Sequence, residues 1–418
     1  MIRWTFAVST SKNLRRWPAR LRNERDFKCY WHFWNNMCRL TAGWLAGLAL
    51  LVQVLGYAPL SDDTLLRRLP RPKPSDFDIH AGPLLSPILI PRVPGTPGSR
   101  KVLQHFDNFF QSSLPAWTVT FQNSTSKTPT HGDQEVPFVN FIASRDPPWA
   151  PSGNVGRLTL VAHYDSKYKP DGFIGAIDSA APCAMIMHAV QSIDAALTKK
   201  WDSMHTDEVD LDFEEYKGIQ VLFLDGEEAF QSWTATDSIY GARSLAAEWE
   251  RTMHPATSIY KNFLDSIELF VLLDLLGSPE DSPIPSWQHT SHWSYVKLAA
   301  MEQRLRSLGL FKSSPSRTFL PEKDKKETDV FRSYVMQDDH IPFIARGVQV
   351  LHLIPMRFPS VWHTLNDDGE HLDIPTVEDW ALLTSAFAAE YLELEGFFDP
   401  LAAAKFKREQ SMTSKTEL

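Results

Sequence analysis

The sequence predicts an α/β fold: a single three-layer α/β/α domain with a mixed, mainly parallel central sheet. Short apolar runs of strand length, such as residues 158–162 and 218–224, alternate with longer segments of helical periodicity, such as 180–197. This alternation is typical of a mainly parallel sheet covered by helices on both faces. The composition is that of a globular protein, since 43% of the 418 residues are hydrophobic and 22% are charged.

The order of the elements follows from periodicity and from the residues that interrupt it. The first helix is expected because Leu103, Phe106 and Phe110 share one face at helical spacing. Charged stretches without periodicity, 202–215 and 311–333, are expected to be loops. In chain order the pattern predicts helix 100–111, strands 117–121, 139–143 and 158–162, helix 180–197, strand 218–224, helix 242–250, strand 269–273, helix 293–308, strand 348–353 and helix 377–394.

The N-terminal sequence predicts a targeting signal, and the alternative is a buried core helix. Residues 1–39 are rich in Arg and Lys, and 40–58 form an uncharged, mostly apolar run. At ~1.5 Å per residue, a helix of this length crosses a thin bilayer. Three alternatives stay open: a transmembrane signal anchor, a cleaved signal peptide, or a start at Met37 that leaves an ordinary signal peptide. Each places the domain in the secretory pathway, either secreted or lumenal on an ER or Golgi membrane.

The domain boundaries are expected where composition changes. Residues 59–83 are rich in proline and are expected to be a linker or a surface arm, followed by a catalytic domain over 84–396. The tail, 397–418, is expected to be disordered at its end. A glycosylation sequon, Asn123-Ser124-Thr125, is expected in a polar loop and agrees with a lumenal address.

Charge and cysteine content exclude some classes of function. The net charge of −9 is modest and the domain shows no basic stretch, so no nucleic-acid partner is expected. Cys29 and Cys38 lie outside the presumed domain, which leaves Cys183 without a partner for an intradomain disulfide. The protein is expected to be a monomer.

Five short motifs place candidate site residues, most of them directly after apolar strands. In a parallel sheet the carboxyl ends of the strands meet at one edge, where ligands bind. Carboxylates with imidazole and without thiolate suit a catalytic zinc that keeps an open position. Each residue alone is weak support, because a lone Asp before a helix is more often a cap. The residues are His163, Asp165, Asp178, Glu227, Glu228, Asp274 and His363.

The central motif is the pair Glu227-Glu228, which follows the strand ending at Leu224. Adjacent carboxylates repel, so a site that holds both needs a cation, a shared proton or divided roles. We expect divided roles, in which Glu228 binds a metal and Glu227 moves protons. The alternative is a solvated Asp-Gly turn with acidic decoration.

In these motifs and their order the chain resembles the M28-type zinc aminopeptidases, and one branch in particular, the glutaminyl-peptide cyclotransferases (glutaminyl cyclases). The resemblance runs from about residue 84 to 396. The shared strings are 163–168, 178–185, 225–230, 237–241, 273–277, 337–343, 350–355, 358–359 and 361–364.

The resemblance implies a role for each matching residue. Asp178, Glu228 and His363 would bind one zinc ion. Glu227 would be the general acid/base, with Asp274 and Asp338 as a hydrogen-bond relay beside it. The pocket wall would comprise Trp233, Phe358 and Trp362, with Gln337 at the entrance. The family's cysteine before the His-Tyr-Asp string is replaced by Ala162, so Cys183 lacks its usual disulfide partner.

The implied reaction is cyclisation of an N-terminal Gln, and also Glu, of peptides and proteins to pyroglutamate. Two alternatives remain. A two-zinc aminopeptidase would use His163, Asp178, Glu228, Asp274 and His363 as ligands, with Glu227 activating water. A catalytically inactive lumenal binding domain would lack a ligand or the base, and none is missing from the sequence. One zinc per chain favours the cyclase, and two favour the peptidase.

Overall fold

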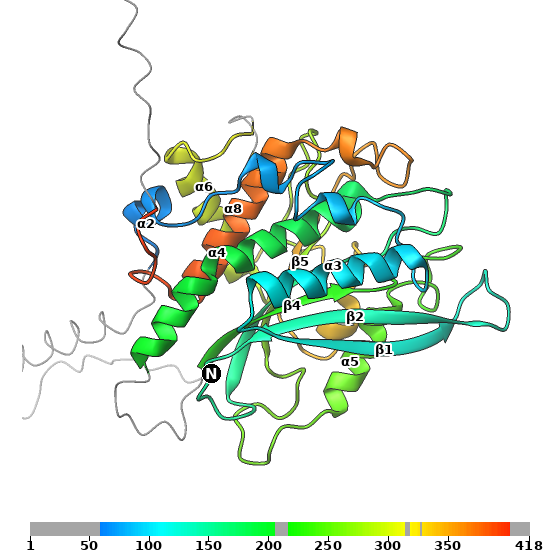
Figure 1. Cartoon of the computed structure of the whole chain (residues 1–418), viewed down its shortest axis with the longest axis horizontal. Helices are drawn as coiled ribbons and strands as arrows, with labels where there is room; N and C mark the ends of the chain where they lie inside the picture. Colours follow the sequence, from blue (N-terminus) through cyan, green and yellow to red (C-terminus); the bar gives the residue numbers. More distant parts are fainter. Residues whose placement is uncertain (1–58, 205–215, 314–317, 327, 402–418) are drawn as a thin grey trace, which may run out of the picture. The chain divides into compact units, whose positions relative to one another are not determined.

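The computed structural model describes residues 59–204, 216–313, 318–326 and 328–401. Its centre is one six-stranded sheet in the order β1-β2-β4-β3-β5-β6 (Figure 1). β4, β3, β5 and β6 are mutually parallel, while β2 pairs antiparallel with both β1 and β4. The sheet is therefore mixed and mainly parallel, which confirms the predicted fold class. The strands are β1 Thr118–Lys127, β2 Glu135–Arg145, β3 Val155–His163, β4 Tyr216–Leu224, β5 Ile267–Leu273 and β6 Val350–Leu353.

Helices cover both faces of the sheet (Figure 1). Alternate residues of a strand point to opposite faces of the sheet, so each central strand contributes side chains to two hydrophobic cores. Leu158 and Leu160 of β3 pack in the larger core with α3, α4, α6 and α8, whereas Val161 packs in a smaller core with α5 and Phe343 of α7. The helices are α2 Asp62–Arg67, α3 Pro97–Ser113, α4 Ala181–Met204, α5 Tyr240–Arg251, α6 His292–Ser307, α7 Ile341–Ile344 and α8 Ile374–Tyr391.

The proline-rich segment packs against the domain. Leu65, Leu69 and Phe77 are fully buried in the larger core, and the backbone N–H of Leu60 donates to Glu390 of α8 at 3.0 Å. Prolines there restrict the backbone without preventing α2 or this burial. From residue 59 onward the described chain is thus part of the folded unit, so the expected linker over 59–83 is a packed arm.

The sequon also lies in a different setting from the one predicted. Asn123 is in the middle of β1, where its side chain is exposed, and not in a polar loop. β1 was predicted to end at residue 121, but its ladder with β2 continues to Lys127 opposite Glu135. The extra residues, 122–127, are all polar, which a solvent-facing edge strand tolerates.

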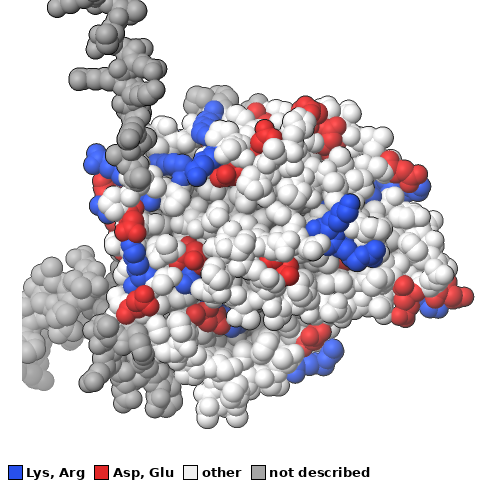
Figure 2. Space-filling view, viewed as in Figure 1, with Lys and Arg blue, Asp and Glu red and all other residues white. Residues whose placement is uncertain are grey.

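Several predictions fall partly or wholly outside the described residues. These concern the basic segment 1–39, the apolar run 40–58, part of the loop 202–215 and the end of the tail 397–418. Among the described residues, no helix combines the length and apolarity needed to cross a bilayer. On the face seen in Figure 2, described Lys and Arg side chains lie interspersed with Asp and Glu.

Candidate active site

The chemically active side chains meet at the carboxyl ends of the parallel strands. His163 ends β3, Glu227 and Glu228 follow β4, and Asp274 follows β5. Asp178 comes from the helical turn Ala176–Ala180 that precedes α4, and His363 from the loop after β6. Parallel strands make this convergence possible because their ends share one edge.

Gly226 lets the chain turn sharply from β4 into the two glutamates. Its φ of +74° is in the left-handed region, and a Cβ there would lie 2.4 Å from the ring of Phe138. Only glycine meets both conditions without strain. The backbone N–H groups of Glu227 and Glu228 then donate to the buried carboxylate of Asp165, at 3.0 and 3.2 Å. Asp165 thereby fixes the orientation of both glutamates.

Asp178, Glu228 and His363 form a compact cluster of potential metal ligands. One ligand atom from each lies within 4.8 Å of the others. His363 Nε2 is 3.3 Å from Glu228 Oε1 and 3.5 Å from Asp178 Oδ2. Both carboxylates are buried, and His363 is partly exposed. His363 has a positive φ of 57°, which a non-glycine residue adopts only where its surroundings hold it.

The donor set fits a divalent cation. Glu228 Oε1 is buried and has no hydrogen-bond partner among the described residues, although it faces His363. Such an oxygen is costly to bury unless it is paired or coordinates a metal. Two carboxylates and one imidazole are also the mixture found at catalytic zinc sites, with a fourth position left for substrate.

The fold gives the two adjacent glutamates opposite electrostatic surroundings. Burial raises the pKa of Glu227 well above its usual value, and the negative charges of Glu228 and Asp338 raise it further. Burial acts in the same direction on Glu228, but the close imidazole of His363, together with the charge of Lys167, outweighs it and lowers the pKa of Glu228 to about 2. Lys167 Nζ lies 3.2 Å from Glu228 Oε2. The surroundings therefore favour the anionic form of Glu228 and the protonated form of Glu227.

A second cluster centres on the buried imidazole of His163. Its Nε2 is 2.9 Å from Asp178 Oδ1 and 3.6 Å from Asp274 Oδ1, and these three side chains also satisfy the geometry of a metal site. Burial would lower the pKa of His163, but the close carboxylates of Asp165, Asp178 and Asp274 outweigh it and raise the pKa well above its usual value.

Of the two expected relay residues, Asp274 belongs to this cluster and Asp338 has a partner of its own. Asp274 Oδ1 accepts hydrogen bonds from Ser179 Oγ and from the backbone N–H of Leu275. Asp338 Oδ2 is 2.6 Å from His352 Nε2. Burial and the charge of Asp274 raise the pKa of Asp338 well above its usual value. Several carboxyl groups crowded in this way share protons instead of ionising independently.

A cavity of about 470 Å³ opens over the cluster. The indole N–H of Trp233 donates to Gln337 Oε1 at 2.9 Å across the mouth. Trp362 stacks on His363 with 3.8 Å between ring centroids, and Phe358 packs on Trp362. All four residues expected to bind substrate line this cavity, together with Lys167, Asp178, Glu227, Asp274 and His363.

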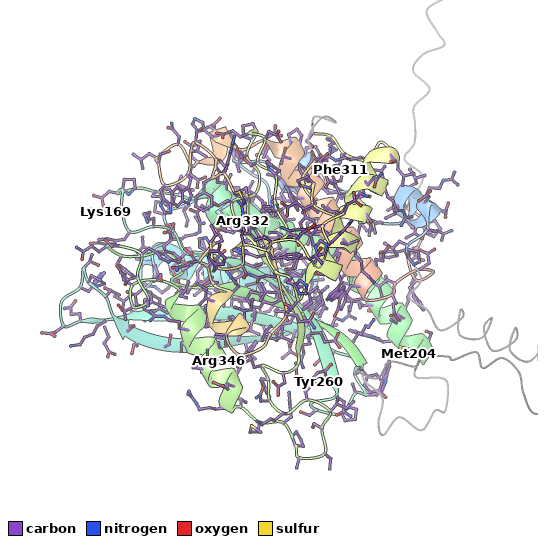
Figure 3. The ribbon with its side chains drawn as sticks, turned by 180° about the vertical axis from the view of Figure 1, so that it is seen from behind. Lys169, Met204, Tyr260, Phe311, Arg332 and Arg346 are labelled. Carbon is purple, nitrogen blue, oxygen red and sulfur yellow. The ribbon has the colours of Figure 1, made fainter. Side chains whose placement is uncertain are left out.

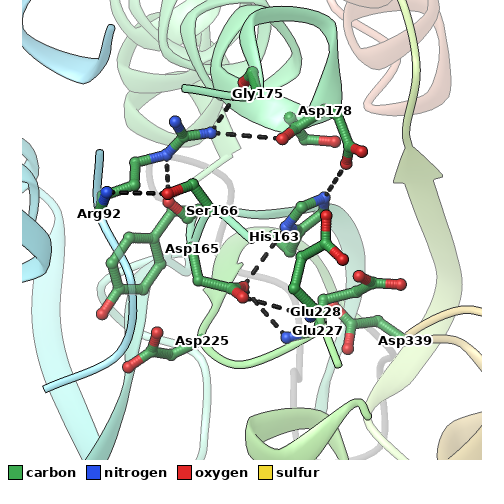
Figure 4. A network of polar contacts seen from close by, with 12 residues as sticks. Arg92, His163, Asp165, Ser166, Gly175, Asp178, Asp225, Glu227, Glu228 and Asp339 are labelled. Atoms are coloured by element: carbon green, nitrogen blue, oxygen red, sulfur yellow. Dashed lines mark hydrogen bonds and ion pairs between the residues drawn. The ribbon is translucent and has the colours of Figure 1, made fainter. Parts of the chain in front are cut away.

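Sequence reasoning missed Arg92, which follows the packed arm in the chain and reaches the loops of the site (Figure 4). The side chain is fully buried, and its guanidinium donates to the backbone carbonyls of Tyr164, Ile174 and Gly175. The Arg92 backbone N–H donates to Ser166 Oγ at 2.8 Å. Arg92 therefore ties together the loop after His163 and the loop that carries Asp178. A single Arg among prolines gives no sequence signal for this role.

Comparison with known proteins agrees with this geometry. The model of "Peptidase family M28" matches residues 147–388. A glutaminyl-peptide cyclotransferase of Boiga irregularis is 40% identical over 319 residues, which cover 74% of this chain and 80% of that protein. The glutaminyl-peptide cyclotransferase of Bos taurus is 38% identical over 318 residues, covering 74% and 81%. The chain belongs to the glutaminyl-peptide cyclotransferase family, within peptidase family M28.

The solved structures extend this result to the fold. The crystal structure of Macrostomum lignano glutaminyl cyclase superposes with a TM-score of 0.63 at 30% identity, covering 82% of this chain and 96% of that one. The match to family M28 begins at residue 147, so Arg92 and the packed arm lie outside it. In the chain described, Cys183 is a buried free thiol, and its Sγ lies 3.3 Å from the carbonyl oxygen of His163.

Proposed function

We propose that this protein is a zinc-dependent glutaminyl-peptide cyclotransferase, which converts N-terminal Gln, and also Glu, of peptides and proteins to pyroglutamate. With Gln the reaction joins the α-amine to the side-chain amide carbon and releases ammonia. The observation that carries the proposal is the cluster of Asp178, Glu228 and His363, two members of which, Asp178 and His363, line a cavity together with Glu227. Relatives about 40% identical over most of the chain are glutaminyl-peptide cyclotransferases.

Zinc would be held by Asp178, Glu228 and His363, one ion per chain. When bound there, it supplies Lewis-acid chemistry that polarises the side-chain amide carbonyl and stabilises negative charge on its oxygen. Lys167 holds the second oxygen of Glu228, which leaves Oε1 directed at His363 and the cluster. The protein thus presents a fixed set of donors with room for a substrate group beside them.

Glu227 is the proposed general acid/base. Its carboxylate takes a proton from the attacking amine and returns it to the departing ammonia, a contribution of ~10²–10⁴-fold in typical enzymes. This task needs a group whose pKa is above that of an ordinary carboxyl group, and burial beside Glu228 and Asp338 provides such a shift. Asp338 and Asp274 act behind it, since shared protons among buried carboxyl groups keep Glu227 available in both forms.

The aromatic walls give the site its selectivity for cyclisation. Water in the cavity would compete with the amine, and hydrolysis would follow. Trp233, Phe358 and Trp362 present flat apolar surfaces that exclude water and pack on a small substrate side chain. The stacking of Trp362 on His363 also orients that imidazole.

A two-metal aminopeptidase is the second candidate. The cluster of His163, Asp178 and Asp274 favours it, because its ligand atoms satisfy metal geometry and Asp178 belongs to both clusters. The hydrogen bonds that Asp274 accepts from Ser179 and Leu275 favour the cyclase, since they use a carboxylate that a second ion would require. Metal stoichiometry separates the two functions.

The test is to incubate the purified protein with a Gln-initiated peptide and to follow the products by mass spectrometry, alongside elemental analysis of the protein. We expect a mass loss of one ammonia per peptide and one zinc per chain. Release of free Gln with two zinc ions would establish the peptidase instead.

We also propose that the catalytic domain acts in the secretory pathway, secreted or attached to an ER or Golgi membrane through residues 40–58, and that it is a monomer. The basic-then-apolar N-terminal sequence and the exposed Asn123 within a sequon support this location. Membrane fractionation, glycosidase sensitivity of the wild type against Asn123→Gln, and the mass in solution would test the three statements separately.

A further inference from the structure

A second cavity lies directly beside the catalytic one and has the opposite charge. Its volume is about 510 Å³, and it shares two lining residues, Trp233 and Gln337, with the catalytic cavity. These two side chains are joined by a hydrogen bond and line both cavities, so they separate one cavity from the other. We call this pair the Trp233–Gln337 partition. The catalytic cavity is lined by three carboxylates, whereas Arg243 and Arg346 line the second cavity and no Asp or Glu does.

We propose that this second cavity is a subsite for the substrate chain downstream of its N-terminal Gln, and that it favours an acidic side chain there. The proposal rests on the cyclotransferase function proposed above. Cyclisation requires both the α-amine and the side chain of the first residue to lie in the catalytic cavity, so the remainder of the peptide must leave through its mouth. A chain that crosses the Trp233–Gln337 partition enters the second cavity.

Two other cavities offer no equivalent route. A cavity of about 570 Å³ near Trp287 and Met356 shares no lining residue with the catalytic cavity. A third, beside Leu275 and Gly277, has a volume of only about 30 Å³, which is too small for a peptide side chain. Of these three cavities, the one beyond the partition is both adjacent to the catalytic cavity and large enough.

The lining of the second cavity suits a peptide. Ile239, Ile341 and Pro342 supply apolar contact, while Thr234 and Ser238 add hydroxyl groups. Arg346 lies near α5 and α7 on the face seen in Figure 3. Its Nε is 2.9 Å from Glu250 Oε2, a carboxylate outside the lining, and its Nη1 donates to the carbonyl of Pro342 at 2.8 Å.

Arg243 contributes the second positive charge and is held rigidly. Its guanidinium donates to the carbonyl of Ala235 at 2.8 Å and lies 5.0 Å from the ring centroid of Tyr240. Its Nε is buried and has no hydrogen-bond partner among the described residues. The carboxylate of Asp237 interacts with Arg243 from outside the lining, where it is buried and accepts hydrogen bonds from three backbone N–H groups and Tyr240.

The experiment compares amidated Gln-initiated peptides that differ at one position, with Glu against Gln at the second, third or fourth residue. We expect Glu to raise kcat/KM by about 2- to 5-fold at one or more of these positions, mainly through KM, as is usual for a partly exposed ion pair. This gain in kcat/KM should disappear at high salt concentration, because salt screens the ion pair between the peptide Glu and the arginines of the cavity.

Three variants test whether the second cavity causes the preference, with the Glu-to-Gln ratio of kcat/KM as the readout. Ala345→Glu places a negative charge on the lining and should abolish or reverse the preference. Arg346→Gln should reduce it. Glu250→Gln, which breaks the same ion pair but keeps the arginine, should retain or increase it. Arg243 is left intact because its bonds support the loop that carries Trp233.

The results distinguish the two proposals. If the neutral peptides are cyclised but no position prefers Glu, or if Ala345→Glu leaves the ratio unchanged, the subsite is wrong and the cyclotransferase function stands. If no peptide loses ammonia, both proposals are overturned together.

Discussion

At the scale of single residues, the site depends on how differently the fold treats Glu227 and Glu228. The two side chains are chemically identical neighbours, and Asp165 holds both of their backbone N–H groups. His363 and Lys167 surround Glu228 with positive charge, which lowers its pKa to about 2. Glu227 faces burial and the carboxylates of Glu228 and Asp338, which raise its pKa. One glutamate is suited to bind a cation and the other to move a proton.

The substitution Glu227→Gln tests this division of roles. We expect the variant to retain one zinc per chain, because the three ligands are untouched, and to lose turnover by ~10²–10⁴-fold, because the amide moves no proton. Metal analysis and ammonia release from a Gln-initiated peptide provide the two readouts. Glu370→Gln, at a carboxylate far more exposed, is the control and should keep both. Loss of zinc from Glu227→Gln would refute the division.

Arg92 shows that a residue distant in sequence supports the ligands. Its guanidinium contacts carbonyls from both loops, and its charge lies near Asp165 and Asp178. A residue that orients metal ligands through their loops is expected to affect metal affinity by ~10–100-fold when it is changed.

We therefore expect Arg92→Lys, which keeps the charge but loses the planar fork, to weaken zinc binding by about 10-fold or more. Competition with a chelator measures the affinity, and the melting temperature of the zinc-free protein separates this effect from general destabilisation. Arg332→Lys, at an exposed position, is the matched control. An unchanged zinc affinity in Arg92→Lys would show that the loops hold their geometry without Arg92.

At the scale of elements, helix α4 links the packed arm to the sheet. It is buried along most of its length because α8, β3 and the arm all contact it. His188 on this helix is 4% exposed, has its Nε2 3.1 Å from Ser192 Oγ, and packs near Phe77 of the arm. Burial, together with the charge of Lys73, lowers the pKa of His188 to about 4.

This pKa shift predicts how stability depends on pH. Between the ordinary His pKa of about 6.5 and the lowered value, the unfolded chain binds a proton that the folded chain does not. The contribution of His188 to stability is therefore present above pH 6.5 and is lost as pH falls toward 4, by about 2 kcal/mol at pH 5.

In His188→Gln, which keeps a hydrogen-bonding group toward Ser192, this part of the pH dependence should disappear. Urea unfolding at pH 7.5 and pH 5 measures the difference in the free energy of unfolding for the wild type and the variant. His80→Gln, at an exposed histidine, should behave as the wild type does. Equal acid destabilisation in His188→Gln would show that His188 is protonated in the folded state.

At the scale of the whole molecule, the arm is part of the folded domain. Leu60, Leu65, Leu69 and Phe77 are buried in the larger core, although they precede the stretch first expected to form the domain. Each such side chain contributes ~1.5–3 kcal/mol on burial, so together they are comparable to the net stability of a typical domain.

We expect a chain that starts at residue 59 to fold and to retain activity, and one that starts at residue 84 to be unfolded or insoluble. Soluble yield and thermal melting measure the outcome. The truncation removes many contacts at once, so Leu65→Ala and Phe77→Ala in the chain that starts at residue 59 are the finer test. Each is expected to lower the free energy of unfolding by ~2–5 kcal/mol. Full stability of the chain that starts at residue 84 would show that the arm is dispensable.

The fold class and the convergence of the site residues followed from the sequence, because both depend on local patterns. Each parallel strand is a short apolar run, and the polar residue directly after it must lie at the shared edge. For this reason the sequence alone predicted that Glu228, Asp274 and His163 lie close together. The resemblance to a known family added Asp338, Gln337 and the aromatic wall, which no periodicity indicates.

Only the tertiary structure decided the features that depend on atoms from distant parts of the chain. These include the burial of Arg92 beneath two loops, the packing of residues 59–83, and the second cavity beyond Trp233 and Gln337. A pattern along the chain specifies which face of an element is apolar, but not what packs against that face. Burial, charge and shape at a site are properties of the assembled core, and long-range packing determines them.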